Sequence, residues 1–142
     1  MTAVRIRYAT ADDRDWLKMR DVHVVSEAWL ERCLDLGEYI IAEQSGERIG
    51  FLRFSLFWGV IPYMDMIGVD APLRRQGIGA ALVVFWEQEM HSRGAKLIMT
   101  SAQANEPEAV AWHQKNGFAF SGEMSFRPLQ APAELFMTKP VS

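Results

Sequence analysis

The chain has 142 residues, of which 49% are hydrophobic and 23% charged, and its formal net charge is −3. This is most simply one soluble globular domain with a substantial core, and the weakly negative charge excludes an overall basic field for nucleic acid. The single cysteine, Cys33, excludes an internal disulfide and a multi-cysteine metal site, and it is interpreted as a buried helix thiol.

The predicted elements begin with an alternating strand at residues 4–8. A helix is expected next, with Thr10 and Asp12 as its N-cap candidates. A second helix is predicted over residues 26–36, and Gly37 ends it. Both helices precede the next strand signal in the chain.

A β-hairpin is predicted after these helices. Residues 38–44 and 48–58 read as strands on either side of a short Ser-Gly-Glu turn. Gly59 and Pro62 are expected to interrupt the chain before an apolar strand at residues 63–70. One carboxylate, Asp65, stands in the middle of that apolar run.

The second half alternates helices and strands. A helix is predicted over residues 77–93, a strand over 96–102, a helix between Pro107 and Gly117, and two closing strands. The order β-α-α-β-β-β-α-β-α-β-β predicts an α/β fold of α+β type, with a single mixed central sheet and helices on both faces. One domain is expected over residues 1–142.

The segment "RRQGIG" at residues 74–79 lies between a predicted strand and a predicted helix. The first N–H groups of a helix lack intrahelical partners, and the macrodipole adds partial positive charge there. Gly77 and Gly79 allow a close approach to the backbone, and Arg74 and Arg75 add positive charge. The segment therefore predicts a phosphate site, most simply for a diphosphate. The alternative is a capping turn with two solvated arginines.

The stretch "VDAPLRRQGIGAALV" resembles the central motif of the GNAT superfamily of N-acetyltransferases, a strand followed by [RQ]-x-x-G-x-[GA] and a helix. Arg74, Gly77 and Gly79 occupy its defining positions. A second signature of the family is an Asn after the next strand and a helix that closes in Gly-Phe, and "NEPEAVAWHQKNGF" matches it. The matching residues are Asn105, Ala109, Gly117 and Phe118. The order of elements extends the resemblance over nearly the whole chain.

The resemblance implies an acyltransferase that moves an acetyl group from acetyl-CoA, as co-substrate, to a primary amine. The turn would hold the coenzyme pyrophosphate, and the preceding strand would pair with the pantetheine arm. The cofactor-binding residues that it implies are Ile67, Val69, Arg74, Arg75, Gln76, Gly77, Ile78, Gly79, Ala80 and Asn105. No metal is expected, because His23 and His91 have no companions at ligand spacing.

Three residues are candidates for the chemistry. Asp65 is the candidate base, because a carboxylate in an apolar strand is costly unless it is paired or functional; a structural aspartate is the alternative. His113 stands where family members commonly carry Tyr, and its reference pKa of about 6.5, against about 10 for Tyr, leaves a minority protonated at pH 7. A packed or solvated histidine is the alternative. Tyr63 is a further hydroxyl donor.

The acceptor is expected to be an amine of a small molecule or a peptide, and a homodimer is compatible with the family. Trp29, Phe57 and Trp58 are the candidate substrate-binding residues, with core packing as the alternative. No nucleic acid or membrane partner is expected. Without a leader-like segment or a membrane-length apolar run, a cytoplasmic location is expected. An acyl-CoA-binding sensor or regulatory module, and a nucleotide-binding protein, are the competing functions.

Overall fold

The structure is a computed structural model that describes residues 3–142. The chain forms two compact units. The first contains the chain up to Ser55 together with Met66–Gln88, and the second contains Leu56–Asp65 together with Glu89–Ser142. Two strands and one long helix contribute residues to both units, so the units share secondary-structure elements.

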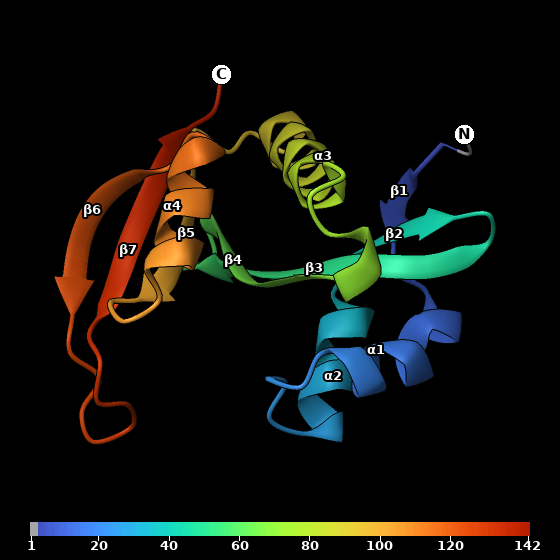
Figure 1. The fold of residues 1–142 in the computed structure, drawn as a ribbon, viewed down its shortest axis with the longest axis horizontal. Coiled ribbons are helices and arrows are strands. Elements are labelled where there is room, and N and C mark those ends of the chain that lie inside the picture. Colours follow the sequence, from blue (N-terminus) through green and yellow to red (C-terminus); the bar gives the residue numbers. More distant parts are fainter. Residues whose placement is uncertain (1–2) are drawn as a thin grey trace. The chain divides into compact units, whose positions relative to one another are not determined.

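Over residues 3–142, seven strands and four α-helices follow in the predicted order (Figure 1). The strands are β1 (Arg5–Tyr8), β2 (Tyr39–Gln44), β3 (Glu47–Phe57), β4 (Ile61–Val69), β5 (Leu97–Gln103), β6 (Ala119–Met124) and β7 (Glu134–Pro140). The α-helices are α1 (Arg14–Arg20), α2 (Glu27–Asp35), α3 (Ile78–Ser92) and α4 (Pro107–Lys115). Two 3-10 turns, η1 (Ala11–Asp13) and η2 (Ala71–Leu73), precede α1 and α3.

The strands form one mixed sheet in the order β1-β2-β3-β4-β5-β7-β6. β4 and β5 pair in parallel, whereas β1 with β2, β2 with β3, β5 with β7 and β6 with β7 are antiparallel. The predicted mixed sheet is confirmed. Figure 1 shows α1 and α2 on one side of β2 and β3, and α3 on the other side, so the expected helices on both faces are confirmed in the first unit.

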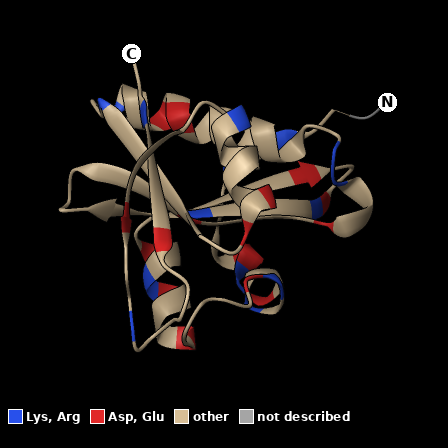
Figure 2. Ribbon diagram, turned by 60° about the vertical axis from the view of Figure 1, so that its left-hand side comes forward, with Lys and Arg blue, Asp and Glu red and all other residues tan. Residues whose placement is uncertain are grey.

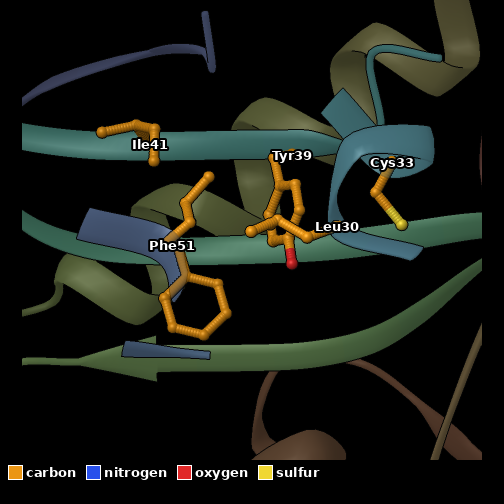
Figure 3. Packing of buried hydrophobic residues seen from close by; sticks show 6 residues of the cluster. Leu30, Cys33, Tyr39, Ile41 and Phe51 are labelled. Atoms are coloured by element: carbon orange, nitrogen blue, oxygen red, sulfur yellow. The ribbon is translucent and has the colours of Figure 1, made fainter. Parts of the chain in front are cut away.

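Alternation along β2 and β3 gives the first unit two buried layers. On one face, Tyr39, Ile41 and Phe51 pack against Leu30 and Cys33 of α2 (Figure 3). Cys33 is 2% exposed, so the predicted buried helix thiol is confirmed. At the edge of this layer, the hydroxyl of Tyr39 donates to Oδ2 of the buried Asp21 at 2.6 Å, and the same oxygen accepts from Nε of the buried Arg53 at 2.7 Å.

The opposite face of β2 and β3 packs on α3. The ring of Phe54 lies 6.1 Å from that of Trp86, and both side chains are fully buried. The buried residues of α3 form one stripe at spacings of three and four positions, as a helix covering a sheet requires. They include Ile78, Leu82, Trp86 and Met90.

Local signals explain most element ends. Thr10 precedes η1 and its backbone N–H donates to Oδ2 of Asp13 at 2.7 Å, whereas Asp12 lies inside the turn and does not cap it. Ser26 caps α2 through its Oγ, which accepts from the N–H of Trp29 at 3.1 Å. Gly37, at φ +69°, ends the same helix as predicted.

The hairpin between β3 and β4 has a shorter turn region than expected, because β4 begins two residues earlier than predicted. The turn is closed by a hydrogen bond of 3.0 Å from the N–H of Val60 to the carbonyl of Phe57, and Gly59 adopts φ +69°. β4 then begins at Ile61 and includes Pro62, so the expected interruption at Pro62 is wrong. Proline is tolerated at the beginning of a strand, where its missing N–H need not break the ladder.

In the second unit, the C-terminal strand β7 lies between β5 and β6. Helix α4 begins with Pro107 in its first turn and ends before Gly117, which adopts φ +97°, as the sequence predicts. Phe118, which follows, is buried and packs edge-on to the ring of His113.

Candidate active site

The turn at residues 74–77 connects η2 to α3 in the first unit. The first hydrogen bond of the helix runs from the N–H of Ala81 to the carbonyl of Gly77, at 3.0 Å. The N–H groups of Ile78, Gly79 and Ala80 therefore precede the first intrahelical bond. Together with the positive end of a 15-residue helix, they provide donors and partial positive charge for an anion.

The turn is open where an anion would approach. Gly77 adopts φ +81°, and a Cβ built there meets no other atom within 4 Å. Arg75, with φ +67°, is also left-handed. The exposed Arg74 donates from Nε to the carbonyl of Val69 at 3.1 Å, which ties the turn to the end of β4. Unpaired helix N–H groups, an open glycine and two exposed guanidinium groups fit a diphosphate.

Tight packing fixes the strand that leads into this turn. A Cβ built on Gly68 would lie 2.8 Å from Cε1 of the buried Phe51. A Cβ built on Gly50 would lie 3.0 Å from the carbonyl oxygen of Gly68. The two glycines therefore allow β3 and β4 to approach closely. Ile67 and Val69, the residues expected to line the pantetheine arm, lie half-buried on this fixed strand.

The candidate catalytic residues Tyr63 and Asp65 lie on β4 in the second unit, and both are half-buried. The period of two places them on one face of the strand. The Oη of Tyr63 lies 2.5 Å from the Oγ of Ser101, which in turn donates to Oε2 of Glu134 at 2.6 Å. Sequence reasoning missed Ser101 and Glu134, since only the pairing of β5 with β7 brings them together.

The third candidate, His113, points inward as its helical spacing predicts. It is 7% exposed, and the rings of Trp112 and Phe118 lie 5.4 Å and 6.1 Å from its own. Burial lowers the pKa of His113 to about 4, so the imidazole is neutral at pH 7. Within residues 3–142, its buried Nδ1 has no hydrogen-bond partner. These observations favour a packed histidine.

The remaining expected residues lie apart along the chain. Asn105 is exposed in the turn between β5 and α4. Trp29 belongs to the first unit, where the guanidinium carbon of Arg32 lies 4.6 Å from the centroid of its ring. Phe57 and Trp58 belong to the second unit, and their rings lie 4.7 Å apart at the β3–β4 turn. Trp58 is 81% exposed, so it is available to a ligand or partner.

Charges of both signs are spread over the described part of the chain. Figure 2 shows basic and acidic positions interspersed along the ribbon. Among residues 3–142, no three His, Cys, Asp or Glu side chains gather as a metal site would require. No helix in the same range is long and apolar enough to cross a bilayer.

Comparisons with known proteins agree with this arrangement. The model of the acetyltransferase (GNAT) family matches residues 6–118, a range that runs through both units. An uncharacterized protein of Bacillus subtilis (strain 168), YdhI, is 30% identical over 93 residues, which are 63% of this chain. The match covers 54% of YdhI, so the chain spans about half the length of this relative.

Two solved structures show the same fold over 99% of the chain. Ard1 from Thermoplasma volcanium has a TM-score of 0.86 at 16% identity and covers 99% of both chains. YncA from Salmonella typhimurium, a putative acetyltransferase solved with its cofactor acetyl-CoA, has a TM-score of 0.77 at 17% identity and covers 99% of this chain and 95% of its own. The family match, the fold and the glycine turn together establish that the chain belongs to the GNAT acetyltransferase family.

Proposed function

We propose that this protein transfers an acetyl group from acetyl-CoA to the primary amine of a small molecule or peptide. The observation that carries the proposal is the turn before α3, where Gly77 is open and the first helical N–H groups stand beside two exposed arginines. Family membership and the likeness to a structure solved with acetyl-CoA support the same coenzyme. The single-domain organisation expected from the sequence is part of the proposal.

The residues that would hold the coenzyme divide by chemistry. Backbone N–H groups of residues 76–80 would bind the pyrophosphate, because a helix N-terminus favours anions. Arg74 and Arg75 would add charge-assisted contacts from the solvent side. The β4 backbone near Ile67 and Val69 would accompany the pantetheine arm, and Asn105 would contact that arm or the acceptor. When bound, acetyl-CoA supplies an activated thioester.

Asp65 is our proposed base. An aliphatic amine is mostly an ammonium at pH 7 and must lose a proton before or during attack. A half-buried carboxylate on β4 provides an acceptor for that proton, directly or through water. Because burial keeps His113 neutral at pH 7, we assign it to packing and leave the proton supply of the thiolate to solvent.

Exposed aromatic groups are proposed to bind the acceptor, and each unit contributes its own. In the second unit, the tilted rings of Phe57 and Trp58 lie 4.7 Å apart at the β3–β4 turn, and in the first unit Trp29 is 37% exposed on α2. Aromatic rings would bind the apolar body of an amine, while a carboxylate would attract its charged end. The proposed acceptor class is therefore an amine attached to an apolar group, whether in a small molecule or at a peptide terminus.

The test is release of the coenzyme A thiol from acetyl-CoA across a panel of amines. The panel should contain polyamines, aminoglycosides, amino acids, arylalkylamines and peptide N-termini, with a control that lacks amine. We expect release with at least one class, and a loss of turnover in Asp65→Asn while calorimetry shows that acetyl-CoA still binds. If no amine increases thiol release but acetyl-CoA still binds, the protein is an acyl-CoA-binding module and not an enzyme. If acetyl-CoA does not bind, the assignment of the turn to the coenzyme is wrong.

A further inference from the structure

A chain of three hydrogen-bonded side chains crosses β4, β5 and β7 in the second unit. The Oη of Tyr63 lies 2.5 Å from the Oγ of Ser101, and that Oγ lies 2.6 Å from Oε2 of Glu134. The other carboxylate oxygen, Oε1, accepts a hydrogen bond of 2.9 Å from Nε2 of Gln130. All four side chains are half-buried. The chain therefore ends on a carboxylate that is held on both sides.

The strand register brings these groups together. Tyr63 is the partner of Met99 on the parallel strand β5, and Ser101 follows two residues later on the same face as Met99. On β7, Phe136 is the partner of Ser101, and Glu134 precedes it by two residues on the same face. The three polar groups thus share one face of three neighbouring strands.

The carboxylate sets the direction of the hydrogen bonds. An ionised carboxylate only accepts, and a serine hydroxyl has a single proton to donate. Because Ser101 donates to Glu134, its oxygen must accept from the hydroxyl of Tyr63. The hydroxyl proton of Tyr63 therefore points toward Oγ of Ser101. Toward any other group, the Tyr63 oxygen can act only as a hydrogen-bond acceptor. A group that approaches this oxygen has to be a donor, as an amine N–H is.

The surroundings of Tyr63 are aromatic. Its ring lies 6.3 Å from that of Phe136, and the ring of Phe126 lies 6.2 Å from that of Phe136. Hydrogen bonds in such a partly apolar setting are stronger than in water. The proposed base, Asp65, follows on the same face of β4, so an acceptor that reaches this face meets both groups.

We propose that Tyr63, Ser101 and Glu134 form a proton relay that removes the N–H proton of the acceptor amine. The relay rests on the proposed function. Asp65 takes the first proton, which turns the ammonium into a neutral amine. As the nitrogen then forms its bond to the acyl carbon, its second proton moves to Oη of Tyr63, the Tyr63 proton to Oγ of Ser101, and the Ser101 proton to Oε2 of Glu134. The C–S bond breaks, and its electron pair leaves with the sulfur, which takes a proton from water. Glu134 then returns its proton to water.

The roles of the three residues differ. Tyr63 is a catalytic residue in this proposal because its oxygen touches the reacting nitrogen. Ser101 and Glu134 act through it and are positioning residues. The relay also changes the role expected for Tyr63, which accepts a proton from the amine and does not supply one to the thiolate.

The test uses two substitutions at Ser101 that have the same shape. Ser101→Thr keeps the hydroxyl, and Ser101→Val replaces it by a methyl group in the same β-branched outline. We expect Ser101→Val to lower kcat at least tenfold, because acid–base groups typically contribute about 10²- to 10⁴-fold. Ser101→Thr should restore most of that loss, and KM for acetyl-CoA should stay within twofold in both variants.

Two further readouts separate a relay from a structural role. The solvent deuterium isotope effect on kcat should fall in Ser101→Val, since the proton no longer passes through the hydroxyl chain. As a matched control, Ser121 contacts Thr138 at 2.6 Å without a carboxylate in the pair, so Ser121→Val should keep kcat within twofold. A Ser101→Val enzyme with kcat within threefold of Ser101→Thr and an unchanged isotope effect overturns the relay.

The hydrogen-bonded chain is also tested without turnover. The protein contains three tyrosines, and ¹³Cζ labelling gives one NMR signal for each, with Tyr63→Phe identifying its own. Ser101→Val and Glu134→Gln should shift the Tyr63 signal and leave the other two in place. An unchanged Tyr63 signal in an active protein removes only the relay. A wild-type protein that acetylates no amine removes the proposed function and the relay with it.

Discussion

Replacing Gly77 by alanine separates the cost of a strained backbone from the loss of a phosphate contact. At φ +81°, a Cβ strains the backbone, and the left-handed conformation costs about 1–2 kcal/mol for a residue with a side chain. No atom lies within 4 Å of the new methyl group, so no steric clash adds to that cost. We expect Tm to fall by roughly 2–8 °C and the fold to persist.

Coenzyme affinity should fall by more than the strain alone explains. The methyl group projects into the open side of the turn, where it holds phosphate oxygens away from the backbone. Loss of one charge-assisted hydrogen bond corresponds to about 1.5–3 kcal/mol, which weakens Kd for acetyl-CoA roughly 10- to 150-fold. Isothermal titration calorimetry measures this change directly.

The chain offers a matched control for this experiment. Gly37 lies in the same unit, adopts φ +69°, and a Cβ built there also meets no atom within 4 Å. Gly37→Ala should therefore lose a similar amount of thermal stability and keep its affinity for acetyl-CoA. Equal affinities in the Gly77→Ala, Gly37→Ala and wild-type proteins would refute the assignment of the turn to the coenzyme.

Three further substitutions, with Gly122→Ala as a fourth that serves as a control, test the packing and the buried charges. Asp13→Asn should cost about 3 kcal/mol, because this fully buried carboxylate is paired with two arginines. The wild-type protein should lose about 3 kcal/mol of stability between pH 6.5 and 4, because burial lowers the pKa of His113 to about 4. His113→Phe should remove this pH-dependent loss and leave kcat unchanged. Gly68→Ala should cost about 1–3 kcal/mol, since its Cβ would lie 2.8 Å from Phe51, whereas Gly122→Ala, with open space, should be neutral. Urea unfolding at several pH values measures all four.

The two pH effects fall in different windows. Burial alone would raise the pKa of Asp13, but hydrogen bonds from Arg7, Arg48 and the N–H of Thr10 outweigh it, and the pKa lies well below its usual range. Such a carboxylate stabilises the fold above its unfolded pKa, about 3.9, and this contribution is lost as the pH falls below that value. The effect of His113 begins at a higher pH. Stability falls as the pH drops below about 6.5, the unfolded pKa of histidine, because protonation then favours the unfolded state. Equal pH profiles for His113→Phe and the wild type would contradict its assignment to packing.

Sequence patterns predicted the features that depend on neighbouring residues. Helix ends at Ser26 and Gly37, the glycine turn before α3 and the inward direction of His113 all follow from local spacing, and the structure agrees. The start of β4 at Ile61 was not predicted from local spacing. A proline indicates a break in the strand, but the sequence does not show whether the sheet needs an N–H at that position.

The polar partners of Tyr63 lay beyond local reasoning. Ser101 and Glu134 are separated by 33 positions and meet only because β7 pairs with β5. Their register depends on which strand enters the sheet between β5 and β6, and a pattern within one strand cannot specify its neighbour. The charge of Glu134 therefore looked like that of any carboxylate at the beginning of a strand.

The position of β7 also determines when the second unit can be completed during synthesis. This strand, Glu134–Pro140, leaves the ribosome after β5 and β6, yet it lies between them in the sheet. Until it emerges, β5 and β6 each keep an open hydrogen-bonding edge, and open edges favour association with other chains. Pairing of β7 with β5 and β6 therefore competes with association of these open strand edges with another chain.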